Sequence, residues 1–182
     1  MICTAVIATS LDGFIARLDG GLDWLSSVEA EGQDYGFAAF MKTVDALVMG
    51  RKTFEIVRDF PEWPYGEKTV AVLTQDPLTL LQPLPKPVIV LPPDPEAVIA
   101  HFADQGAKHL YIDGGQTIRG FLACGHLNRL IISRIPILLG QGIPLFGSLP
   151  ADIRLQHTET VSFPSGLVQS TYEVLTQPDV EL

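Results

Sequence analysis

Two short segments of the sequence combine glycine with side chains that can bind a phosphate group. The first is Gly50-Arg51-Lys52-Thr53 and the second is Gly114-Gly115-Gln116-Thr117, and each follows a short apolar run. Glycine lets the backbone approach a ligand closely, and the first turn of a helix presents free N–H groups with a partial positive charge. The pattern predicts anion binding, although a helix start with solvated basic residues explains the first segment, taken alone, equally well.

Neither segment matches a standard nucleotide-binding motif. The sequence lacks both the G-x-G-x-x-G fingerprint of a Rossmann domain and the G-x-x-x-x-G-K-[ST] loop of a nucleoside triphosphatase. A pair of glycines is also typical of a simple tight turn. Two such junctions in one sheet are a stronger signal, because ligands of open α/β sheets lie at the carboxyl ends of the strands.

The elements that must position these segments alternate between strand and helix, as in an α/β fold. The expected strands cover residues 3–8, 46–49, 69–74, 87–91, 109–112 and 127–135, and the expected helices begin near Asp34, Thr53, Asp94 and Gln116. Residues 154–163 and 167–175 predict an antiparallel hairpin. We therefore expect a single domain over residues 1–182, with a central, mostly parallel sheet flanked by helices and a C-terminal antiparallel hairpin.

Composition limits the ligands of the chain. The 182 residues carry a formal net charge of -9 without a run of Lys or Arg, so we expect no nucleic-acid partner. No apolar run approaches the ~20 residues that span a bilayer, and the first residues are typical of a strand rather than of a signal peptide. We expect a cytoplasmic protein with no membrane partner. The cysteines and histidines match no metal-ligand spacing, so we expect no metal.

Five blocks of sequence, taken together and in order, resemble the dihydrofolate reductase-like superfamily. Within it they are similar to the reductase domain of the bifunctional riboflavin-biosynthesis deaminase–reductase and to its stand-alone relatives. The blocks cover residues 8–16, 21–24, 45–53, 111–117 and 137–146. The resemblance extends over nearly the whole chain. It implies a three-layer α/β reductase that uses NADPH to reduce a small molecule.

The resemblance assigns the two glycine segments to the cofactor. Gly50, Arg51, Lys52 and Thr53 would face its phosphates, and Gly114, Gly115, Gln116 and Thr117 would face the pyrophosphate and the nicotinamide side. Thr74 and Gln75, at a strand end, would lie near the adenosine 2′-phosphate. Asp76 follows them and disfavours a phosphate there, so NADH is a competing cofactor.

The resemblance also outlines the nicotinamide pocket. Ala8, Ile15 and Ala16 would line it, and residues 139–144 would close over the same site. The helix that follows Asp34 would carry part of the substrate pocket, with Phe37 as a substrate-binding residue.

Asp34 and Asp12 are the candidate catalytic residues. Asp34 stands where dihydrofolate reductase carries its pterin-binding carboxylate, and in that place it would bind an aminopyrimidine ring or tune proton delivery. An N-cap explains Asp at a helix start equally well. Asp12 either faces the substrate or only shapes its turn.

Departures from the two known reductases bear on the substrate. Residues 63–69 lack the arginine that holds the folate tail, and Asp23 stands in place of a proline, so folate is not the expected substrate. The basic stretch that binds the ribose phosphate in riboflavin reductases is also missing. Arg58 is the first candidate for binding a phosphate group of the substrate, and Arg17 and Lys42 are further candidates.

Three hypotheses follow for the function. The first is NADPH-dependent reduction of a substrate that resembles 5-amino-6-(5-phosphoribosylamino)uracil. The second is an enzyme of the same fold that reduces a pteridine or another imine or carbonyl. The third is a nucleotide-binding module without turnover. The C-terminal hairpin ends in an edge strand that needs covering, so we expect a homodimer.

Overall fold

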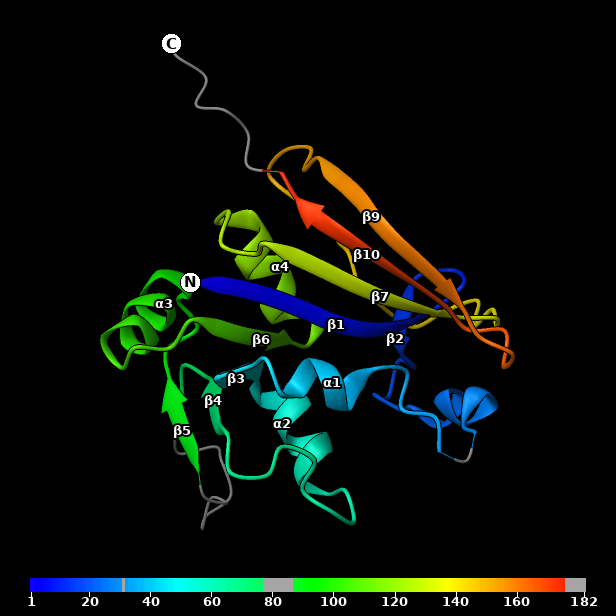
Figure 1. Ribbon diagram of the computed structural model, residues 1–182, viewed down its shortest axis with the longest axis horizontal. Helices are drawn as coiled ribbons and strands as arrows, with labels where there is room; N and C mark the ends of the chain where they lie inside the picture. The colour runs from blue at the N-terminus through cyan, green and yellow to red at the C-terminus, as the bar shows by residue number, and fades with distance from the viewer. Residues whose placement is uncertain (31, 77–86, 176–182) are drawn as a thin grey trace.

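The computed structural model describes residues 1–30, 32–76 and 87–175, which form a large sheet covered by helices (Figure 1). The strands of this sheet are β1 (Ile2–Ser10), β3 (Ala46–Gly50), β4 (Thr69–Leu73), β5 (Val88–Leu91), β6 (His109–Asp113), β7 (Arg129–Ile135), β9 (Leu155–Ser162) and β10 (Val168–Val174). The helices are the 3₁₀ helix η1 (Asp23–Val28), α1 (Phe37–Met41), α2 (Arg51–Arg58), α3 (Pro95–Asp104) and α4 (Gly115–Ala123). Two short strands, β2 (Phe14–Ala16) and β8 (Ile143–Pro144), pair with each other outside this sheet.

The strand order confirms the expected α/β fold. Among the described residues the sheet has 8 strands, in the order β5-β4-β3-β6-β1-β7-β10-β9. Those from β5 to β7 pair in parallel, whereas β10 pairs antiparallel with both β7 and β9. The chain therefore has the mostly parallel sheet and the C-terminal antiparallel hairpin that the sequence predicts.

Helices cover both faces of the sheet, because successive residues of a strand point to opposite sides. In β3, Val48 packs in a core cluster with Phe102 of α3 and Phe121 of α4. Its neighbours Leu47 and Met49 pack in a second cluster that contains residues of α1 and α2. Burial on both faces explains the continuous apolar run of β3 and gives the three layers of the fold.

The hairpin leaves β9 at one edge of the sheet. Within the described ranges β9 pairs on one side only, with β10, and its residues are exposed. An exposed edge strand offers backbone groups to a second chain. The homodimer stays a prediction. In the described part of the chain, no helix is long and apolar enough to cross a membrane.

Candidate active site

The two glycine segments meet at one edge of the sheet. Met49 pairs with Asp113, so the neighbouring parallel strands β3 and β6 end side by side, and α2 and α4 begin next to each other. A methyl group built on Gly114 would overlap Thr53 Oγ1, and one built on Gly50 would lie 3.3 Å from Thr117 Oγ1. Each helix start thus packs its threonine against the glycine of the other.

The first turns of α2 and α4 have free N–H groups. Neither helix has a side-chain cap at its N-terminus, in contrast to α3, where Asp94 accepts hydrogen bonds from two backbone N–H groups. Arg51 lies 3.8 Å from Glu55, and its side chain is 38% exposed, so this pair holds it only weakly. Lys52 is exposed. Uncapped N–H groups beside two cations can bind a phosphate or pyrophosphate.

A buried carboxyl group precedes the Gly-Gly pair. Asp113 ends β6, is 8% exposed and accepts a hydrogen bond of 2.7 Å from the Gly114 N–H. Burial raises its pKa to about 6, although the hydrogen bonds from Gly114 and Tyr111 lower it. The sequence analysis did not single out Asp113. Its position between a buried strand and a glycine pair is the feature of the sequence that could have identified it as a site residue.

Asp12 fixes one end of the loop over residues 139–145. Its carboxylate accepts hydrogen bonds from the N–H groups of Leu139 (3.2 Å) and Gly140 (2.8 Å) and from the Ser10 hydroxyl (2.6 Å). The hydrogen bond from Ser10, followed by those from the loop, lowers the pKa of Asp12. Asp12 therefore holds the loop, and a catalytic role for it stays a prediction.

Arg119 of α4 fixes the other end of this loop. Its guanidinium donates to the carbonyl oxygens of Pro144 (3.1 Å) and Leu145 (3.0 Å). Ile15 lies directly over the start of α4, since a methyl group built on Gly115 would be 2.7 Å from its Cδ1 atom. The loop and β2 thus lie against the same helix start, as the resemblance implied.

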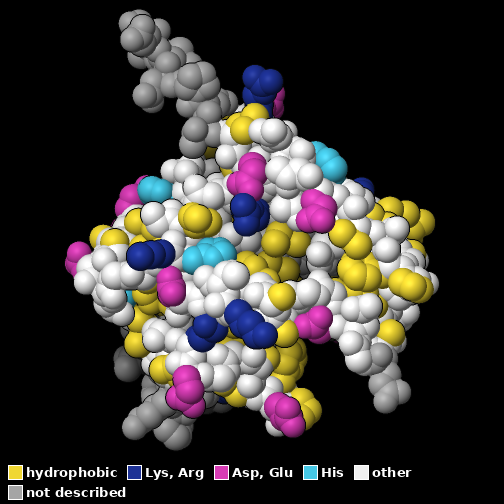
Figure 2. Space-filling model, in the orientation of Figure 1, with side chains coloured by type: hydrophobic (Ala, Val, Ile, Leu, Met, Phe, Trp, Pro, Cys, Tyr) yellow, Lys and Arg dark blue, Asp and Glu magenta, His cyan; other side chains and the backbone are white. Residues whose placement is uncertain are grey.

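A cavity of about 460 Å³ opens between β1, β7, β10 and the segment that leads into α1, and Tyr111 of β6, two residues before Asp113, is among the residues that line it. Figure 2 shows hydrophobic side chains gathered in a hollow in the middle of this face. Most of the lining is apolar or aromatic, from Val6, Ile7, Ala8, Leu25, Val28, Ala30, Tyr35, Gly36, Phe37, Phe40, Tyr111, Ile131, Ile135 and Leu167. The remaining lining residues are polar, namely Glu29, Gln33, Asp34, Ser133 and Gln169. Such a lining suits a flat ring held by a few polar groups.

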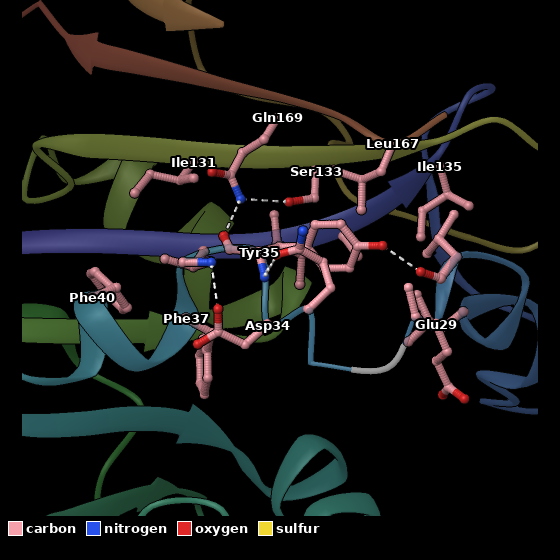
Figure 3. A pocket seen from close by; sticks show the side chains of 18 of the residues that line it. Glu29, Asp34, Tyr35, Phe37, Phe40, Ile131, Ser133, Ile135, Leu167 and Gln169 are labelled. Carbon is pink, nitrogen blue, oxygen red and sulfur yellow. Dashed lines mark hydrogen bonds between the residues drawn. The ribbon is translucent and has the colours of Figure 1, made fainter. Parts of the chain in front are cut away.

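Polar contacts cross the cavity between its two walls (Figure 3). Gln169 Nε2 of β10 donates to the Tyr35 carbonyl oxygen (3.2 Å) and to Ser133 Oγ of β7 (3.0 Å). The Tyr35 hydroxyl donates to the Val28 carbonyl and lies 3.0 Å from Ser165 Oγ. These contacts tie the segment before α1 to the C-terminal hairpin. The sequence analysis missed Gln169, Ser133 and Tyr35, because they converge from elements far apart in the chain.

Asp34 lies at the cavity and binds the backbone at the start of α1, and its catalytic role stays a prediction. It lines the cavity, and its carboxylate accepts hydrogen bonds from the N–H groups of Gly36 (3.0 Å) and Ala38 (2.9 Å) at the start of α1. The hydrogen bond from Ala38, followed by that from Gly36, lowers its pKa. The group is therefore ionised at neutral pH, which suits an acceptor better than a proton donor.

The structure brings most of the predicted site residues together. Ala8, Asp34 and Phe37 line the cavity. Ala5 of β1 pairs with Ile112 of β6, so Ala8 lies further along β1, toward the end of the sheet where the glycine junctions are. Ala16 lies in β2 and is buried. Gln116 is exposed in the first turn of α4.

Apart from Ala8, Asp34 and Phe37, the predicted site residues do not line the cavity. Leu73 pairs with Gly50, so Thr74 and Gln75 follow β4 at the same edge of the sheet as the junctions. Arg58 is at the end of α2, donates to Asp59 (3.2 Å) and does not line the cavity. Within the described ranges, no group of three or more His, Cys, Asp or Glu side chains is arranged to hold a metal ion.

Comparisons with known proteins agree with this geometry. The family model described as the RibD C-terminal domain matches residues 2–169. The chain is 36% identical over 159 residues to YwjB, an uncharacterized protein of Bacillus subtilis (strain 168), with 86% of this chain and 89% of YwjB covered. A crystal structure from Shewanella sp. PV-4, which carries a provisional riboflavin-biosynthesis name, is 39% identical with a TM-score of 0.86, covering 97% of this chain and 100% of that one.

A more distant structure shows the same fold. Dihydrofolate reductase from Enterococcus faecalis, in complex with NADP(H) and RAB-propyl, has a TM-score of 0.65 at 22% identity. The match covers 95% of this chain and 96% of the reductase. The chain has the dihydrofolate reductase-like fold and belongs to the family of the RibD C-terminal domain.

Proposed function

We propose that the chain is an NADPH-dependent reductase of a small heterocyclic compound, similar to the uracil reductase of riboflavin biosynthesis. The observation that carries the proposal is the interlocked pair of uncapped helix starts at Gly50 and Gly114, in a fold that also contains a largely apolar cavity. Family membership in a reductase domain supports the same activity.

The residues at the junctions fit a dinucleotide. Gly50, Gly114 and Gly115 let the threonines and Ile15 pack closely against the two helix starts, so the first turns of α2 and α4 lie together, where a pyrophosphate can bind. Arg51 and Lys52 add positive charge. NADPH, when bound, supplies a hydride to the substrate. Ala8 and Ile15 would flank its nicotinamide.

The cavity residues position the substrate. Phe37, Phe40 and Tyr111 present aromatic surface, which excludes water from a ring stacked there. The ionised Asp34 at the mouth accepts a hydrogen bond from a ring N–H or amino group. Reduction also requires a proton. Because the pKa of Asp34 is lowered, a water molecule or another group has to deliver it.

The absorbance of NADPH provides the test. Purified protein is incubated with NADPH and a panel of ring compounds with C=N or C=O groups, including aminopyrimidines and pteridines. We expect oxidation of NADPH with an aminopyrimidine or a related ring, and no oxidation by the double variant Gly114→Ala, Lys52→Ala. NADPH binding without turnover on any compound of the panel would favour a nucleotide-binding module instead.

A further inference from the structure

The charges that line the cavity have a single sign. Among the residues that the structure describes, Glu29 and Asp34 are the charged ones that line the cavity, and no Lys or Arg is part of the lining. Backbone hydrogen bonds lower the pKa of Asp34, so this carboxylate keeps its charge at neutral pH. A phosphate or carboxylate group on a bound ligand would therefore meet repulsion without a compensating cation.

Several groups that could hold an anion already bind a carboxylate. The N–H groups of Gly36 and Ala38 at the start of α1 donate to the Asp34 carboxylate. Arg17 makes two hydrogen bonds to Asp23, of 2.6 and 2.8 Å. Like Arg58, it does not line the cavity. The arginines expected to bind a substrate phosphate are thus paired with carboxylates elsewhere.

One wall of the cavity presents a fixed acceptor next to a donor. The Tyr35 carbonyl can only accept a hydrogen bond, so the amide of Gln169 must face it with nitrogen, and its Oε1 atom points elsewhere. No described residue donates to this Oε1 atom. Ser133 Oγ accepts from the same amide nitrogen, which leaves its hydroxyl hydrogen free to donate. Both groups line the cavity (Figure 3).

We infer that the cavity selects an uncharged heteroaromatic ring that carries no phosphate or carboxylate group. A ring N–H donates to Gln169 Oε1, and a ring carbonyl accepts from the Ser133 hydroxyl. The inference rests on the proposed function in that it treats this cavity as the substrate site. The inferred ligand differs from a phosphoribosyl compound, because no cation among the described lining residues is there to bind a phosphate.

Three ligands that differ in one feature at a time provide the test. They are 5,6-diaminouracil, its N-riboside and the 5′-phosphate of that riboside, each titrated calorimetrically into the full chain. We expect the ring and the riboside to bind, and the phosphate to weaken binding of the riboside at least about tenfold at low salt. Equal or tighter binding of the phosphate, or no binding of any of the three, would overturn the inference.

Two conservative variants test the donor and the acceptor. We expect Ser133→Ala and Gln169→Leu each to weaken binding of the ring by roughly three- to tenfold, the effect of one neutral hydrogen bond. Ser162→Ala and Gln156→Leu make the same changes on the exposed strand β9 and serve as controls. Unchanged binding in both cavity variants, with thermal melting close to that of the unaltered chain, would contradict the proposed contacts.

A third variant reverses the charge preference. Gln33 is exposed and lines the cavity, so Gln33→Arg adds a cation without disturbing the core. We expect it to restore binding of the phosphorylated riboside to at least the level of the riboside. Failure to improve phosphate binding would count against charge as the basis of selection.

Titrations with and without saturating NADPH separate this inference from the proposed function. Discrimination among the three ligands by cofactor-free protein that does not bind NADPH supports the inference and contradicts the reductase. Binding of NADPH together with preference for the phosphorylated riboside supports the reductase and contradicts the inference.

Discussion

The Thr53 hydroxyl at the start of α2 lies directly against the Cα atom of Gly114 at the start of α4. The reciprocal contact joins Thr117 to Gly50. Two helix starts that are distant in sequence are thereby held in one position. Any side chain at residue 114 has to displace Thr53, so the geometry of the proposed phosphate site depends on this glycine.

Gly114→Ala tests this dependence. Gly114 has a φ of 85°, a conformation that costs a residue with a side chain about 1–3 kcal/mol, and the overlap with Thr53 adds to that. We expect a loss of at least about 2 kcal/mol in urea unfolding and the loss of NADPH binding. Gly125→Ala is the matched control, with a φ of 71° and no atom within 4 Å of the added methyl group. Equal effects of the two substitutions on NADPH binding would contradict the assignment.

The Asp113 carboxyl group makes the stability of the fold depend on pH. Its pKa rises from 3.8 in a model compound to about 6, so the folded state binds a proton more tightly than the unfolded state. The contribution of Asp113 to stability therefore falls as pH rises from about 4 to about 6 and is then constant, with a total loss of about 3 kcal/mol.

Asp113→Asn removes this dependence while Asn Oδ1 still accepts the Gly114 N–H. We expect the variant to gain stability over the unaltered chain at about pH 8 but not at about pH 4, measured by urea unfolding. A difference that does not change with pH would show that folding does not raise the pKa of Asp113.

Asp12→Asn tests the anchoring of the loop. The substitution removes the charge from the hydrogen bonds to Leu139 and Gly140, so we expect faster hydrogen exchange at these two amides. Asp19→Asn, at a turn where Asp19 accepts the Gly21 N–H, is the control. Because the pKa of Asp12 is lowered in the fold, the unaltered loop keeps its protection above the ordinary carboxyl pKa and loses it as pH falls through the lowered value. Unchanged hydrogen exchange at Leu139 and Gly140 in the variant would contradict the role of Asp12 in holding the loop.

The double variant Arg51→Ala, Lys52→Ala tests the charge at the α2 start. Charge-assisted hydrogen bonds to phosphate contribute about 1.5–3 kcal/mol each, so we expect NADPH affinity to fall at least about tenfold. Lys42→Ala, which removes a cation beyond α1 and away from the two junctions, should leave the affinity unchanged. An equal loss of NADPH affinity in the two variants would show that Arg51 and Lys52 act only through the net charge of the chain.

The exposed strand β9 is the surface expected to form a homodimer. Light scattering on a sizing column should give twice the mass of one chain, and Val161→Lys on this strand should give a monomer, because charge at an edge opposes pairing. A mass of one chain for the unaltered protein would contradict the predicted homodimer.

The sequence predicted the elements well where local chemistry decides them. Asp94 with Pro95 marked the start of α3, and the structure shows Asp94 accepting the N–H groups of Glu96 and Ala97. The hairpin around residues 164–166 was equally clear. By contrast, β2 and β8 are short, and they form by pairing with each other across the chain rather than from a local periodicity.

The site could be predicted only where one segment carries it. The glycine junctions are local motifs, and the structure brings them together. Gln169, Ser133 and Tyr35 meet across elements more than thirty positions apart. A single sequence contains no signal for such a meeting, and no local pattern could show that Arg58 pairs with Asp59 rather than reaching the cavity.

Titration of the purified chain with NADPH and with NADH tests the central claim most directly. The interlocked helix starts, with Arg51 and Lys52 beside them, lead us to expect micromolar binding of NADPH, measured by fluorescence or calorimetry, and weaker binding of NADH. Saturable NADPH binding that is lost in Gly114→Ala and kept in Gly125→Ala is the predicted result. Absence of binding by either cofactor would contradict the account and leave the two glycine junctions as structural turns.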